Sequence, residues 1–135
     1  MNNSYKGGMS SYCLFLLIYS YIKFYYNQNN ENINDNIKYA SLLIGLLFFY
    51  IEYIDFNCTI IAPHLVNPFI VKYDLETIPT IIEPTTKKNA GKTIFKIFDV
   101  INILNQIYKD ILYIIKEDNN NKNLIYELIK KYSNN

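Results

Sequence analysis

The stretch GGMSSYCLFLLI, residues 7–18, decides how the chain begins to fold, because a glycine pair and two serines precede an apolar run. Serine favours the N-cap of a helix, and either Ser10 or Ser11 stands where that cap belongs. We therefore expect a helix from about Ser11 to Tyr26. The glycines let the backbone approach a ligand closely, and the free N–H groups of a first helical turn attract anions.

A second helix and a short β-rich segment are expected next. Residues from about Ile37 to Phe56 are apolar nearly throughout, which predicts a helix that is buried on most sides. Between residues 57 and 84, three β-branched runs are separated by prolines, as in brief strands joined by loops. These runs are Thr59–Ile61, Phe69–Val71 and Thr80–Ile82.

The last long helix is expected from Gly91 or Lys92 to Lys116, because apolar residues recur there at the helical period. The expected stripe comprises Ile94, Phe98, Ile101, Leu104, Tyr108, Ile111 and Ile115. Residues 27–36 form an Asn-rich loop, and residues 117–135 contain a polar break, a short helix over Asn123–Tyr132 and a tail. The predicted fold class is mainly α with a small β insert, in a single domain spanning residues 1–135.

The composition excludes several function classes. The 135 residues carry a net charge of +1, and every basic residue is lysine. A strongly basic nucleic-acid footprint is therefore absent, and any RNA contact must be local. Cys13 and Cys58 lie in apolar runs without metal-ligand spacing, which predicts free, buried thiols in a reducing compartment, the nucleus or the cytoplasm. His64, the single histidine, is expected to be structural or exposed.

A membrane role is not expected either. The uncharged runs at residues 9–22 and 39–51 are shorter than the ~20 residues that a transmembrane helix needs. No basic start of a signal peptide precedes the first run. Phosphate-binding loops and dinucleotide fingerprints are also absent, so hydrolase and dehydrogenase functions have no motif behind them.

A second string, EPTTKKNAGK at residues 83–92, follows the last β-branched run. With residues 7–12 it resembles the C-terminal, poly(A)-polymerase-associated region of noncanonical poly(A) polymerases and terminal uridylyltransferases. That family has Gly-Gly-x-Ser-Ser-Tyr at the start of a helix, and a strand ending in Asp-Pro before Asn-Val-Gly-Arg. Here Glu83 replaces Asp, Lys92 replaces Arg, and the loop is one residue shorter. The resemblance extends over roughly Lys6 to Ile115.

The resemblance implies a nucleotide-recognition site. Ser11 would touch the triphosphate, Tyr12 would stack on the base, and the loop from Glu83 to Lys92 would read the base edge. Several uridylyltransferases have His where this chain has Lys88, which favours ATP mildly and leaves UTP open. The expected nucleotide-binding residues are Gly8, Ser11, Tyr12, Glu83, Lys88, Asn89 and Lys92. An ordinary capped helix and a solvated lysine face are the alternatives that involve no ligand.

The residues for phosphoryl transfer are missing from this sequence. The resembled enzymes hold Mg²⁺ or Mn²⁺ on a Gly-Ser motif followed by Asp-x-Asp, and neither motif occurs here. No catalytic residue or metal ligand is therefore assigned. Addition of adenylate or uridylate to an RNA 3′ end is expected only in a larger enzyme that supplies a catalytic palm domain. The chain is then a truncated domain, a subunit of a split enzyme, or a non-catalytic interaction module.

Overall fold

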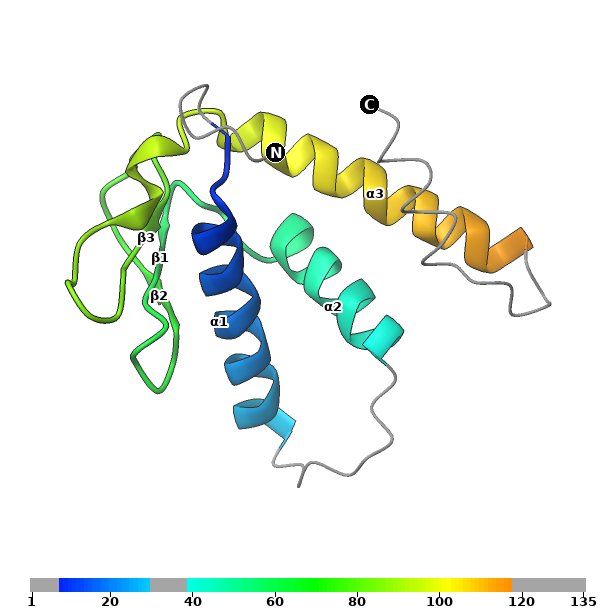
Figure 1. The fold of residues 1–135 in the computed structure, drawn as a ribbon, viewed down its shortest axis with the longest axis horizontal. Coiled ribbons are helices and arrows are strands. Elements are labelled where there is room, and N and C mark those ends of the chain that lie inside the picture. The colour runs from blue at the N-terminus through cyan, green and yellow to red at the C-terminus, as the bar shows by residue number, and fades with distance from the viewer. Residues whose placement is uncertain (1–7, 30–38, 118–135) are drawn as a thin grey trace.

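A computed structural model describes residues 8–29 and 39–117, and it is mainly helical with one small sheet (Figure 1). The elements in chain order are α1 (Ser11–Asn29), α2 (Tyr39–Glu52), β1 (Thr59–Ile61), β2 (Phe69–Val71), β3 (Thr80–Ile81), the 3₁₀-helix η2 (Ala90–Thr93) and α3 (Ile97–Glu117). In Figure 1, α1 lies between the sheet and α2, while α3 runs past the end of both helices. The predicted fold class is thus confirmed at the level of helices and a small β insert.

The sheet has three strands in the order β2-β1-β3. β1 pairs antiparallel with β2, with Ile60 opposite Ile70, and parallel with β3, with Ile61 opposite Ile81. The three strands match the predicted runs, except that β3 ends at Ile81. Ile82 instead forms an isolated bridge with Asn89, which joins the sheet to the segment before η2.

The first helix begins as predicted, and its cap is Ser10. The Ser10 hydroxyl accepts a hydrogen bond from the Cys13 amide at 3.1 Å, and the Leu14 amide bonds the Ser10 carbonyl at 3.0 Å. α1 then continues to Asn29, so residues 27–29 of the predicted loop are helical. The remainder of that loop and the predicted helix over 123–132 lie outside the described residues.

An aromatic cluster joins the two central helices to the sheet. The Phe49 ring of α2 lies 5.2 Å from Phe24 of α1 and 5.0 Å from Phe69 of β2, between ring centroids. Phe24 and Phe69 also meet edge to face at 5.5 Å. Such pairs stabilise packing beyond the area that they bury. The cluster therefore fixes α1 and α2 against one side of the sheet.

A buried hydroxyl adds a directional contact between α1 and α2. Tyr50 is almost wholly buried, and its hydroxyl donates to the Leu17 carbonyl at 2.7 Å. Burial raises the pKa of Tyr50 well above its ordinary value. Nearby, Gly45 faces the Tyr21 hydroxyl so closely that a Cβ there would collide with it. Both contacts set how α1 and α2 pack together.

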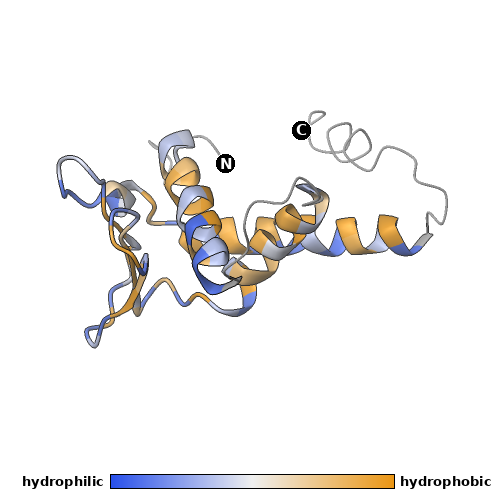
Figure 2. Ribbon diagram, turned by 90° about the horizontal axis from the view of Figure 1, so that it is seen from below, coloured by the Kyte–Doolittle hydropathy of each residue, from blue (hydrophilic) through white to orange (hydrophobic). Residues whose placement is uncertain are grey.

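The prediction that the second helix is buried on most sides is wrong within the described residues. Only Leu47 and Tyr50 of α2 are fully buried, whereas Leu43 and Phe48 are 44% and 39% exposed. Figure 2 shows apolar residues on α2 and also along α3 toward residue 117. α1, α3 and Phe69 of β2 each cover part of α2, and the rest of its apolar surface stays exposed among the described residues.

The predicted start of the last helix is also wrong. The segment after Asn89 forms η2, and Ile94 leaves it with φ −93° and ψ 63°, which is not helical. α3 begins only at Ile97. Of the expected stripe, Ile94, Leu104 and Ile111 are buried. Phe98 and Ile115 are exposed, because the buried face of α3 contains Ile97 and Val100 instead.

The thiols are free, as the sequence predicted. Cys13 is buried with its sulfur 3.1 Å from the Ala90 carbonyl, while Cys58 is only half-buried. The contact of Cys13 ties α1 to η2.

Replacement of Tyr50 by Phe tests the directional contact between α1 and α2. Loss of the buried hydrogen bond is expected to lower the free energy of unfolding by about 1 kcal/mol. Urea denaturation measures the difference. Tyr53→Phe on the same helix is the control, because Tyr53 is 69% exposed and its hydroxyl makes no hydrogen bond with the described residues. Equal stabilities of the two variants would contradict the assigned role of Tyr50.

Candidate functional site

The two strings that the sequence analysis singled out meet in the fold. The Tyr12 hydroxyl, in the first turn of α1, donates to Glu83 Oε1 at 2.9 Å across 71 positions of sequence. This hydrogen bond raises the pKa of the Tyr12 hydroxyl. The Tyr12 side chain remains 47% exposed, so part of its ring is open to solvent.

Glu83 organises the loop that follows β3. Its Oε1 also accepts from the Thr85 amide at 3.0 Å, and its Oε2 accepts from the Thr86 amide. The Thr86 hydroxyl and amide, with the Thr85 amide and the Tyr12 hydroxyl, hold the pKa of the Glu83 carboxyl down at about 2. The backbone closes the same loop: Glu83 N–H donates to the Lys88 carbonyl at 2.9 Å, and Lys87 adopts a φ of 60°.

The Asn89 side chain joins β3 to η2 through three hydrogen bonds. Its Oδ1 accepts from the Ile81 and Gly91 amides at 2.9 and 2.8 Å. Its Nδ2 donates to the Pro79 carbonyl at 3.1 Å. Gly91 packs so tightly on that carbonyl that a Cβ at position 91 would collide with it. Asn89 is therefore committed to holding the fold at this point.

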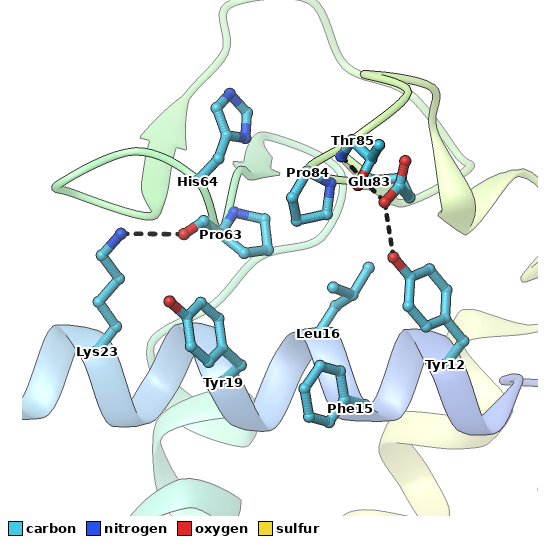
Figure 3. Close-up of a pocket in the computed structure, with 10 residues that line it drawn as sticks. All are labelled: Tyr12, Phe15, Leu16, Tyr19, Lys23, Pro63, His64, Glu83, Pro84 and Thr85. Atoms are coloured by element: carbon cyan, nitrogen blue, oxygen red, sulfur yellow. Dashed lines mark hydrogen bonds between the residues drawn. The ribbon is translucent and has the colours of Figure 1, made fainter.

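A cavity of about 330 Å³ lies between α1 and the loops after β1 and β3 (Figure 3). Its floor is one face of α1, and its opposite wall is formed by Pro63, His64 and the start of the Glu83 loop. The lining residues are Tyr12, Phe15, Leu16, Tyr19, Lys23, Pro63, His64, Glu83, Pro84 and Thr85. This volume is near the lower limit of small-molecule sites, which span about 300–1,000 Å³.

Two of the seven expected nucleotide-binding residues, Tyr12 and Glu83, line this cavity. Ser11 is exposed beside it in the first turn of α1, and Gly8 is half-buried just before the helix. The Lys88 and Lys92 side chains are exposed and do not line the cavity. Asn89 holds β3 and η2, as described above. Gly7 of the first string lies outside the described residues.

The lining residues that were not identified from the sequence as ligand-binding include Phe15, Tyr19, Lys23 and His64. Three of them share a helical face with Tyr12, at offsets of 3, 7 and 11 residues. That spacing could have identified these three residues from the sequence as neighbours of Tyr12 on α1. His64 is exposed, in agreement with the prediction, but its place on the cavity wall depends on the loop after β1. Only the tertiary structure brings this loop opposite α1.

A metal centre is not assembled in residues 8–29 and 39–117. No group of three or more His, Cys, Asp or Glu side chains in these ranges has a geometry that could hold a metal ion. The Mg²⁺ or Mn²⁺ that the resemblance implies thus has no fitting ligand set here, and no reaction step is assigned to it. None of the helices in these ranges combines the length and hydrophobicity that a membrane crossing requires.

Comparisons with known proteins returned no matching protein-family model, no matching curated protein and no matching solved structure.

Replacement of Asn89 by Ala is expected to destabilise the fold by about 2–4 kcal/mol, because three backbone groups lose their partner. Asn89→Asp is the matched comparison: it keeps an acceptor for the Ile81 and Gly91 amides but turns a carboxylate oxygen toward the Pro79 carbonyl, which it repels. Because two of the three hydrogen bonds remain, Asn89→Asp should lower the free energy of unfolding less than Asn89→Ala. Urea denaturation compares them, and an Asn89→Ala variant as stable as the parent would contradict the assigned role.

The depressed pKa of Glu83 predicts a pH dependence of stability. The folded-state pKa lies near 2 against about 4.5 for an unperturbed carboxyl, so its contribution is fully present above pH 4.5. It is lost as the pH falls from about 4.5 toward 2. The stability difference between the parent and Glu83→Gln should therefore shrink over that range. Urea midpoints measured at several pH values check this, and a difference that does not change with pH would contradict it.

Proposed function

We propose that this chain is the nucleotide-recognition part of an RNA 3′-terminal nucleotidyltransferase, related to the helical poly(A)-polymerase-associated domain. The observation that carries the proposal is the hydrogen bond between Tyr12 and Glu83. It brings the two strings of the resemblance to one end of one cavity, although 71 positions separate them. An ordinary capped helix without a ligand would not require Tyr12 and Glu83 to be in contact.

Tyr12 is suited to hold a nucleobase by stacking. Its ring is half-exposed, and Glu83 fixes the direction of its hydroxyl. Stacking on an aromatic ring is worth about 1–3 kcal/mol per base and tolerates any base. A platform of this kind binds ATP and UTP alike, so the preference between them depends on polar contacts at the base edge.

The start of α1 is suited to receive phosphates. Ser10 accepts from the Cys13 amide, which leaves the Ser11 and Tyr12 N–H groups without an acceptor among the described residues. These groups and the exposed Ser11 hydroxyl lie at the N-terminus of a 19-residue helix, where the helix dipole is positive. A triphosphate attached to a base on Tyr12 can reach them. Lys88 and Lys92 can supply further positive charge only from outside the cavity.

The role of Glu83 differs from the one that the resemblance implies. Its carboxylate already accepts hydrogen bonds from Tyr12, Thr85 and Thr86. A base amino group can bond Glu83 only beside or in place of these donors. We therefore assign Glu83 the positioning of the Tyr12 ring and of the loop, with base reading as a secondary part.

The chemistry of transfer is assigned to a catalytic palm domain or partner chain, which would hold the metal ions and the RNA 3′ end. Exposed apolar residues on α2 and α3, among them Leu43, Phe48 and Phe98, support the presence of a partner surface. The same observation supports a second candidate function, a non-catalytic interaction module derived from this family. If the folded parent chain binds neither ATP nor UTP, that second function is favoured.

Tyr12 variants test the proposal in the whole chain. Tyr12→Ala should weaken ATP binding with magnesium by about 5-fold to 100-fold, because the stacking platform is lost. Tyr12→Phe keeps the ring and should stay within a few-fold of the parent. Thermal shift and fluorescence titration with ATP and with UTP measure the affinities.

Tyr73→Ala is the control for these variants, since Tyr73 is 98% exposed and does not line the cavity. Nucleotide affinity that is equal in the parent and in Tyr12→Ala would overturn the proposed site. Extension of a labelled RNA by this chain alone would overturn the assignment of the chemistry to a partner.

A further inference from the structure

α1 exposes two faces of different chemistry. On one side, Ile18 and Ile22 face Leu42, Leu43 and Leu46 of α2 around an almost wholly apolar hollow of about 180 Å³. On the other side, the cavity floor carries aromatic rings with a cation beyond them. Aliphatic surface suits contact with protein, whereas open aromatic rings next to positive charge suit flat, anionic ligands.

Phe15 and Tyr19 lie one helical turn apart on α1, and their rings stack on each other. Their rings are nearly parallel, 19° apart, with centroids separated by 6.3 Å. They are 59% and 46% exposed, so their outer surfaces are open. Figure 3 shows Tyr19 rising from α1 toward Pro63, while Tyr12 lies at the other end of the same face.

The end of the cavity beyond Tyr19 carries positive charge. The Lys23 ammonium donates to the Pro63 carbonyl at 3.1 Å, which fixes its position and leaves two of its three N–H donors for a ligand. His64 follows Pro63 and is exposed on the same wall. The Glu83 carboxylate lies at the opposite end beside Tyr12, so the cavity is negative at one end and cationic at the other.

We propose that the Tyr19 end of this cavity binds a nucleotide unit, with its base stacked on the open face of Tyr19, which Phe15 supports, and its phosphate at Lys23 and His64. Inside the cavity the charge pattern sets the orientation, because the Lys23 ammonium attracts a phosphate to the Tyr19 end. This site goes beyond the proposed function: it uses residues that the Tyr12 site does not need. The nucleotide unit comes either from a free mononucleotide or from one residue of a single strand.

Binding by the whole chain tests the site with two probes, AMP and a fluorescently labelled single-stranded oligoadenylate of about ten residues. Tyr19→Ala should weaken binding of the recognised probe by about 5-fold to 100-fold. Lys23→Gln removes the charge and keeps a donor for Pro63. For the oligoadenylate it should reduce the slope of log K against log salt by about 0.7, the value for one phosphate contact on a single strand.

Tyr73→Ala is the control, and circular dichroism with thermal melting verifies that each variant folds. Loss of affinity in both Tyr19→Ala and Lys23→Gln supports the site. AMP binding then identifies a free nucleotide as the source, and oligoadenylate binding without AMP binding identifies a single strand. Unchanged affinity in either variant, or no binding of either probe at millimolar concentration, overturns the site and leaves this face to a protein partner.

The two proposals fail separately. If ATP binding depends on Tyr12 and not on Tyr19 or Lys23, the proposed function stands and the second site is overturned. If Tyr19 and Lys23 control binding and Tyr12→Ala has no effect, the second site stands and the assignment of Tyr12 is overturned.

Discussion

The mutual packing of Phe24, Phe49 and Phe69 is the contact on which the other arrangements depend. Strands of two or three residues cannot form an independently stable sheet, so β1, β2 and β3 need a helical layer beside them. The aromatic cluster supplies that layer by binding α1 and α2 to β2. Once α1 is fixed in this way, its neighbouring face, with Tyr12 and Tyr19, lies against the loops that complete the cavity.

Local sequence predicted the elements well where the signal was local. The β-branched runs at 59–61 and 69–71 became β1 and β2, and the serine pair placed the start of α1. Prediction from local sequence failed where tertiary contacts determine the structure of a segment. The helical period after Asn89 could not reveal that Asn89 and the buried Gly91 hold that segment in a 3₁₀ turn. Likewise, the long apolar run of α2 showed that the helix is hydrophobic, but not how much of its surface its neighbours cover.

The candidate site was foreseen in part, for the same reason. Tyr12 and Glu83 were singled out by motif, and they meet in the structure. The motif could not distinguish residues that face a ligand from those that maintain the fold. Asn89 belongs to the same string, but both its side-chain oxygen and its side-chain nitrogen bond backbone groups. Tyr19 and Lys23 carried a helical spacing from Tyr12, but the wall that makes them a cavity comes from Pro63 and His64, about 40 positions later.

The absence of arginine has a consequence for the way in which this surface discriminates between anions. Because the chain has lysine and no arginine, no group at the cavity offers the planar, two-pronged fork with which a guanidinium clamps a phosphate. Lys23, a compact point charge tethered to one carbonyl, accepts an anion from a broad range of directions. Geometric selectivity must then come from the rigid parts of the surface, the aromatic rings of α1 and the loop that Glu83 holds closed.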